Sequence, residues 1–262
     1  MKTDRKSLNS NLLRQWLTLG AIVAAFAVNV YANIAPPNGL TIGDISNKFF
    51  GEVQIIPANY AFAIWGIIYL GLIGFGIYQV MPAQRQNTHV ERVGYLLVVA
   101  SLAQIVWVFL FEYQFFGLSV VAMLGILLPL IGIYLRLGIG KERVSRKDKW
   151  FVHIPLSIYL AWISVATIVN IASTLYYWGW NGWGISPQVW TIIMLIVAAA
   201  IAATIIRNGV DIAYPLVVIW AFVAIAVRQA NQPAIAGWAI ALALALGILL
   251  LVNVWRGQTQ KL

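Results

Sequence analysis

The sequence contains no cysteine, and this absence excludes several classes of protein at once. Disulfide-stabilised folds, thiolate nucleophiles and cysteine-ligated metals or clusters all need at least one thiol. Histidine is nearly as scarce, because only His89 and His153 occur in 262 residues. Two imidazoles exclude a histidine-rich metal site and argue against axial haem ligation by a histidine pair, so we expect no bound metal.

Charge is the other scarce property. Charged residues make up only 10% of the chain and hydrophobic residues 61%, whereas a soluble domain has about 25% and about 45–50%. The apolar stretches are long and are separated by short charged or Gly/Pro-containing breaks. They fit helices of about 20 residues and not the alternating segments of about 10 residues that build a membrane barrel. The composition therefore predicts an all-α polytopic membrane protein.

We predict eight transmembrane helices, and their bounds are residues 15–35, 58–80, 93–112, 117–137, 151–176, 188–206, 211–228 and 234–255. A cytoplasmic N-terminus places every lysine and arginine except Lys48 and Arg228 on the cytoplasmic side. The positive-inside rule favours this arrangement, with both termini cytoplasmic. It accounts for the net charge of +9 without nucleic acid, and the basic loops would attract anionic lipid headgroups. The first span also has the layout of a signal peptide, although its apolar run is somewhat long.

The longest predicted connection is the outer loop of residues 36–57. It contains apolar residues that a free linker would not need: Phe49, Phe50, Val53, Ile55 and Ile56. Long ordered loops are often lids or binding loops. The alternative is an interfacial segment that lies on the lipid headgroups, and both interpretations remain open.

Many of the 12 tryptophans fall near predicted span ends, where indole rings prefer to lie. Other aromatic residues recur at helical spacing in the second, third and fifth spans. At 100° per residue each set shares one helix face, and the sets are Phe62, Trp65 and Tyr69; Gln104, Trp107 and Phe111; and Tyr159, Trp162, Ala166 and Asn170, with Thr167 beside the last. An asparagine facing lipid would leave its amide unsatisfied, so the fifth span should turn this face to protein.

Two interpretations of these faces remain open. In the first interpretation these faces form helix–helix contacts, because small and polar residues join transmembrane helices at about 0.6 kcal/mol per hydrogen bond. Alternatively, they line a cavity, since large rigid rings with a few convergent polar groups are what an apolar ligand site needs.

The same residues resemble the tryptophan-rich sensory protein (TspO) family, which includes the mitochondrial translocator protein. That family's second helix carries a proline, an aromatic pair and then W-x-x-L-Y. The stretch PANYAFAIWGIIYLGL supplies Pro57, Tyr60, Phe62, Trp65 and Tyr69. It departs from the family in having tyrosine for the first tryptophan, Ile68 for leucine, one residue fewer before Trp65, and no proline there.

The third and fifth helices extend the resemblance. The family's N-x-x-W-S-x-L-F corresponds to QIVWVFLF, which supplies Gln104, Trp107 and Phe111 with glutamine for asparagine and valine for serine. The family's Y-x-x-W-x-x-x-A-T-x-x-N corresponds without substitution to YLAWISVATIVN, which supplies Tyr159, Trp162, Ala166, Thr167 and Asn170. The acidic residue of the family's fourth helix aligns with Ala122 and is missing.

The resemblance implies a five-helix bundle over residues 1–176, followed by a three-helix transmembrane extension over residues 177–262. It implies a hydrophobic pocket under the first outer loop, a tetrapyrrole or sterol-like ligand, and association as a homodimer. No cofactor is required, and a porphyrin- or haem-type ring is the ligand implied. The expected ligand-binding residues are Tyr60, Phe62, Trp65, Tyr69, Gln104, Trp107, Phe111, Tyr159, Trp162, Ala166, Thr167 and Asn170.

These observations lead us to expect a membrane sensor or regulator that binds a hydrophobic planar small molecule. The alternatives are a transporter or exchanger of such a ligand and a non-catalytic subunit of a membrane complex. No Ser/His/Asp set, metal cluster or nucleotide loop indicates an enzyme, although porphyrin breakdown, proposed for the family, stays open. The expected partners are the bilayer and the ligand, and the expected location is a bacterial cytoplasmic membrane.

Overall fold

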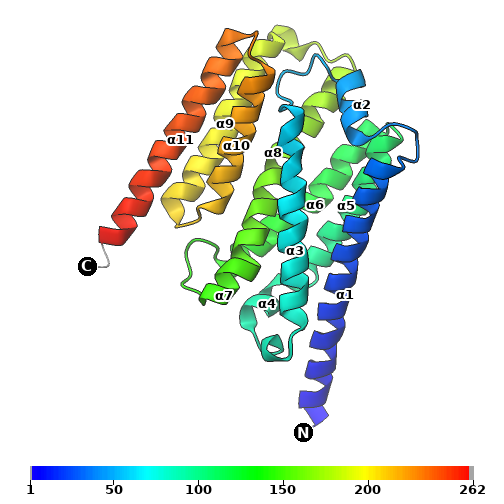
Figure 1. Ribbon diagram of the computed structural model, residues 1–262, viewed down its shortest axis with the longest axis vertical. Helices are drawn as coiled ribbons and strands as arrows, with labels where there is room; N and C mark the ends of the chain where they lie inside the picture. Colours follow the sequence, from blue (N-terminus) through cyan, green and yellow to red (C-terminus); the bar gives the residue numbers. More distant parts are fainter. Residues whose placement is uncertain (1, 260–262) are drawn as a thin grey trace. The chain divides into compact units, whose positions relative to one another are not determined.

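The computed structural model describes residues 2–259, which form helices and connecting turns with no strand among them (Figure 1). The main helices are α1 (Lys2–Ile34), α2 (Ile42–Phe49), α3 (Ile64–Val80), α4 (Thr88–Val93), α5 (Leu96–Glu112), α6 (Phe116–Leu137), α7 (Arg146–Asp148), α8 (Ile154–Tyr177), α9 (Pro187–Asn208), α10 (Ala213–Arg228) and α11 (Pro233–Thr259). A short 3-10 helix, Asn59–Ala63, precedes α3.

Six helical segments among the described residues are long and apolar enough to cross a membrane. Two further apolar helices, α5 and α10, have 17 and 16 residues and lengths of about 25 Å, against a hydrocarbon core of about 30 Å. All eight predicted spans are thus apolar helices, and the protein is a polytopic membrane protein. The cytoplasmic location of both termini stays a prediction, and Lys261, which entered it, lies outside the described residues.

Helix ends in this chain follow the chemistry of individual residues. Helix α9 begins after Ser186, whose hydroxyl accepts a hydrogen bond from the Val189 N–H at 3.3 Å, and Pro187 occupies the first turn. A serine cap followed by proline is a favoured helix start. The serine hydroxyl accepts a hydrogen bond from an N–H of the first turn, and proline has a helical φ and no N–H that would be left unpaired there. Helix α6 ends at Gly138, whose φ of 57° is the left-handed conformation typical of a helix C-terminus.

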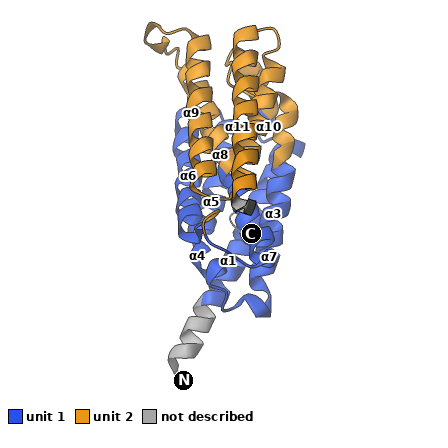
Figure 2. Ribbon diagram, turned by 90° about the vertical axis from the view of Figure 1, so that its left-hand side faces the viewer, with its two compact units in different colours: residues 1–42, 65–138, 142–160 blue, residues 43–64, 139–141, 161–262 orange. Residues whose placement is uncertain are grey.

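The chain forms two compact units (Figure 2). Unit 1 contains the residues up to 42, residues 65–138 and residues 142–160, and unit 2 contains residues 43–64, residues 139–141 and those from 161 onward. Helix α8 contributes its first residues, up to Leu160, to unit 1 and the remainder to unit 2. The predicted division at residue 176 rests on sequence resemblance and stays a prediction.

The beginning of α8 is irregular. A π-helical turn, Lys149–His153, joins α7 to α8. Pro155 has no N–H to donate to the carbonyl of Phe151, four residues earlier, and this missing donor favours the wider turn. Pro155 also packs closely on α3, because a Cβ added at Gly71 would lie 3.0 Å from the Pro155 Cβ atom. Unit 1 therefore needs a glycine at this contact between α3 and α8.

The predicted outer loop of residues 36–57 is ordered and contains α2. Its apolar side chains Phe50, Ile55 and Ile56 are at most 6% exposed. Side chains buried in protein favour the binding-loop interpretation over a segment that lies on lipid headgroups.

Gly140 holds a tight contact between two turns of unit 2. Its φ is +81°, its carbonyl oxygen accepts a hydrogen bond from the Val210 N–H at 2.7 Å, and an added Cβ would lie 2.9 Å from the Asp211 nitrogen. Gly140→Ala is therefore expected to lower the free energy of unfolding by about 2 kcal/mol, through left-handed strain and a backbone clash. Thermal unfolding in detergent measures this effect.

The control for this substitution is Gly237→Ala in α11, where an added Cβ would meet nothing within 4 Å. Alanine is the better helix former, so this variant should be as stable as the wild type or slightly more so. Equal stability of the two variants would contradict the role given to Gly140.

Candidate functional site

The predicted ligand-binding residues divide evenly between the two units. Unit 1 contains Trp65, Tyr69, Gln104, Trp107, Phe111 and Tyr159. Unit 2 contains Tyr60, Phe62, Trp162, Ala166, Thr167 and Asn170.

Three of the unit 1 residues form an aromatic group together with Phe26 of α1. The Trp65 ring stacks on Tyr69 at 5.5 Å between centroids and meets Tyr159 of α8 edge-on at 6.2 Å. Phe26 packs against Tyr69 at 5.1 Å. The fold thus brings together rings from the second and fifth predicted spans, whereas Phe26 was missed because α1 carries no repeated aromatic pattern.

Gln104 of α5 lies beside this group and is 1% exposed. Its Oε1 accepts a weak hydrogen bond from the Tyr159 hydroxyl at 3.4 Å, but its Nε2 has no hydrogen-bond partner among the described residues. A buried donor without an acceptor costs about 1–3 kcal/mol. Such a donor beside aromatic rings is suited to a ligand that brings its own acceptor.

The other two unit 1 residues are packed within the protein. Trp107 stacks on Phe111 at 5.1 Å, and Phe111 meets Phe116 of α6 edge-on at 5.4 Å. Both predicted residues are at most 8% exposed. These contacts are the ones that the helix-packing interpretation expects.

The unit 2 residues form two ring pairs. Phe62 meets Trp162 edge-on at 5.8 Å, and Tyr60 meets Trp220 of α10 edge-on at 5.1 Å. Trp162 is 2% exposed, and its Nε1–H is a second buried donor without a hydrogen-bond partner. Trp220 was missed by the sequence interpretation, although its place in the middle of an apolar span, away from the interfacial belt, is a signal that could have identified it.

The polar face of the fifth span is buried, as its spacing predicts. Asn170 is 3% exposed, and the Thr167 hydroxyl donates to the Ile163 carbonyl at 2.7 Å. Ala166, which precedes Thr167, is partly buried. The asparagine side chain is therefore buried in protein and does not face lipid hydrocarbon, where its amide would find no hydrogen-bond partner.

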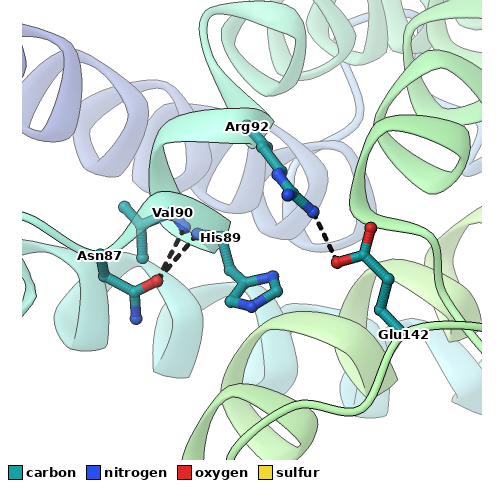
Figure 3. Close-up of polar contacts among 5 residues, drawn as sticks. All are labelled: Asn87, His89, Val90, Arg92 and Glu142. Carbon is teal, nitrogen blue, oxygen red and sulfur yellow. Dashed lines mark hydrogen bonds and ion pairs between the residues drawn. The ribbon is translucent and has the colours of Figure 1, made fainter.

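A second polar cluster in unit 1 is centred on Asp148, which is 8% exposed. Its carboxylate accepts hydrogen bonds from the Tyr78 hydroxyl at 3.0 Å, the Asn87 amide at 2.7 Å and the Ser145 hydroxyl at 2.6 Å. Asn87 in turn caps α4, because its Oδ1 accepts from the N–H of His89 (Figure 3). In the sequence interpretation Tyr78 falls within the predicted span of residues 58–80, whereas Asn87, Ser145 and Asp148 fall between predicted spans.

Two further interactions surround this cluster. Arg92 and Glu142 form an ion pair at 2.6 Å with both side chains more than two-fifths exposed (Figure 3). The rings of His89 and His153 meet edge-on at 5.6 Å between centroids. Within the described residues, no group of three or more histidine, cysteine, aspartate or glutamate side chains could hold a metal ion.

A comparison of the sequence with models of known protein families identifies the family of this chain. The family model described as TSPO-like protein matches residues 15–252 and so extends beyond residue 176 into α9, α10 and α11. No curated protein and no solved structure matches the chain. The family match confirms the resemblance carried by the aromatic motifs, and the chain belongs to the family of TSPO-like proteins.

Proposed function

We propose that this TSPO-like membrane protein binds a hydrophobic, planar small molecule of the tetrapyrrole or sterol class and acts as its sensor or regulator. The observation that supports this proposal is the unmet Nε2 donor of Gln104 beside the aromatic group of unit 1. Large rings with a few placed polar groups are typical of sites for apolar ligands. A carboxylate, carbonyl or hydroxyl oxygen on the ligand would accept from Gln104 and remove the penalty of the buried donor.

The expected affinity follows from these contacts. Each aromatic pair formed with a planar ligand contributes about 0.5–1.5 kcal/mol beyond the burial of area. Two or three such pairs, the buried apolar area and one hydrogen bond together reach about −8 kcal/mol, which corresponds to micromolar binding. No step in this scheme breaks or forms a covalent bond, so we propose no enzymatic activity and no required cofactor.

The proposal includes the setting of the protein. We infer that the chain is in a bacterial cytoplasmic membrane with both termini in the cytoplasm, because lysine and arginine are concentrated in alternate connections. The homodimer implied by the family resemblance belongs to the same proposal. Movement of the bound ligand across the membrane is the second candidate function, and flux into proteoliposomes separates it from binding alone.

Titration with protoporphyrin, and separately with a sterol, tests the proposed function. Purified protein in lipid nanodiscs should show saturable quenching of tryptophan fluorescence by at least one of these probes, with a Kd in the micromolar range. The control is Trp183→Phe, because Trp183 is 77% exposed in the turn between α8 and α9, and this variant should bind as the wild type does. Linear, non-saturating quenching with both probes would contradict the proposal.

A further inference from the structure

The segment Gln54–Phe62, which we call the strap, follows α10 in antiparallel order within unit 2. Its beginning contacts the C-terminal end of α10, its middle contacts the last turns, and its end contacts Trp220 nearer the helix start. Contacts in so regular an order fix the register of the strap on α10, and they involve the main chain and not only side chains.

Three positions of α10 and the residue that follows it, Gln229, form hydrogen bonds to the main chain of the strap. The Gln229 amide donates to the Gln54 carbonyl at 2.9 Å, and the Arg228 guanidinium donates to the Pro57 carbonyl at 3.5 Å. The Ala58 N–H donates to the Ala224 carbonyl at 3.0 Å, and the Trp220 indole N–H donates to the Ala61 carbonyl at 3.2 Å. One side-chain bond joins Gln54 to Gln232 at 3.0 Å.

These bonds satisfy backbone groups of a segment that is mostly not α-helical. Buried main-chain donors and acceptors need partners, and in a membrane protein water cannot always supply them. Ile56 is 1% exposed and Ala61 is 0% exposed, and Gln229 is itself 7% exposed. The strap is therefore anchored by buried apolar side chains and by part-buried hydrogen bonds, while Tyr60 and Trp220 are 42% and 39% exposed.

The strap carries Tyr60 and Phe62, two of the predicted ligand-binding residues. Tyr60 packs against the ring of Trp220, and Phe62 packs against the ring of Trp162. We propose that α10 and the residue after it, Gln229, form a clamp, in which Trp220 and Gln229 are positioning residues that hold the strap and thereby set ligand affinity. This inference rests on the proposed function, and it assigns to α10 the support of Tyr60 and Phe62, although the aromatic motifs lie elsewhere in the chain.

Two substitutions each remove one donor from the clamp. Trp220→Phe keeps an aromatic ring against Tyr60 but removes the indole N–H, and Gln229→Leu keeps the side-chain volume but removes the amide. Hydrogen–deuterium exchange of residues 58–62 is measured without ligand, and protoporphyrin affinity is measured in the same nanodiscs. Each variant should exchange faster in the strap and bind about tenfold more weakly, the effect of losing one hydrogen bond.

The matched control is Trp238→Phe in α11, where the side chain is 46% exposed. It should keep both the exchange rates and the affinity of the wild type. Wild-type exchange of the strap in both clamp variants would overturn the clamp, and faster exchange with unchanged affinity would overturn its role in binding. A wild-type protein that binds no probe overturns the proposed function instead, while the exchange measurement still decides the clamp.

Discussion

Replacing Gln104 by leucine and Tyr159 by phenylalanine together is expected to weaken protoporphyrin binding by about 10- to 100-fold, since one buried donor to the ligand is worth about 1–3 kcal/mol. The free energy of unfolding should stay unchanged or rise. The pair shares only a weak hydrogen bond at 3.4 Å, and the Gln104 Nε2 has no partner. Removing both polar groups while keeping their shapes therefore removes a penalty from the ligand-free protein. Fluorescence titration and thermal unfolding measure the two quantities on the same sample.

The chain offers a matched control for this experiment in Gln15 of α1. Gln15 is also 1% exposed, and within the part of the chain that the structure describes neither polar atom of its side chain has a hydrogen-bond partner. Gln15→Leu should therefore stabilise the protein slightly or leave its stability unchanged, and it should leave protoporphyrin affinity at the wild-type value. If the Gln104/Tyr159 double variant also binds as tightly as the wild type, Gln104 belongs to helix packing and the site assignment is wrong.

Asp148→Ala should be among the most destabilising single substitutions in unit 1. The carboxylate accepts from three side chains that come from separate segments of the chain, and alanine would leave all three donors without this acceptor. Breaking a buried network of this kind costs about 3–5 kcal/mol. Denaturation in detergent, followed by circular dichroism, measures the loss, and protease sensitivity of the α3–α4 connection should rise with it.

Glu142→Ala serves as the comparison for Asp148→Ala. Glu142 also takes part in a short polar interaction, its ion pair with Arg92, but both of these side chains are more than two-fifths exposed. Exposed ion pairs contribute about 0–1 kcal/mol, so this variant should unfold close to the wild type. A similar loss of stability in the two variants would show that burial is not what distinguishes the two carboxylates.

The positions of the apolar helices could be predicted from the sequence, because length and hydrophobicity alone decide which segments span a bilayer. The burial of Asn170 was predictable for a related reason, since an amide in hydrocarbon has no partner. Aromatic spacing placed Trp65 and Tyr159 on the inward faces of two predicted helices, although spacing cannot say which rings meet. These predictions succeed where one short stretch of sequence contains the whole physical cause.

The strap and the Asp148 cluster could not be predicted in this way. Gln54 and Gln229 are 175 positions apart, and Asn87 and Asp148 are 61 positions apart. No local pattern indicates that a glutamine at the end of one helix will meet the carbonyl of a distant loop residue. Asp148 stands among lysines and arginines in the sequence, which is the pattern of a solvated loop, and only the fold shows that its carboxylate is buried.

The π-helical turn between Lys149 and His153 has a consequence for how the length of this protein can vary. A π turn holds one residue more than an α turn in nearly the same rise along the axis. Deleting one residue there would remove the extra residue of the turn without rotating the helix beyond it, and Pro155 would still leave one α-helical hydrogen bond unmade. Insertions and deletions elsewhere before Tyr159 in α8 would turn the later side chains by about 100°, so this turn is where one residue can be lost while the direction of Tyr159 is kept.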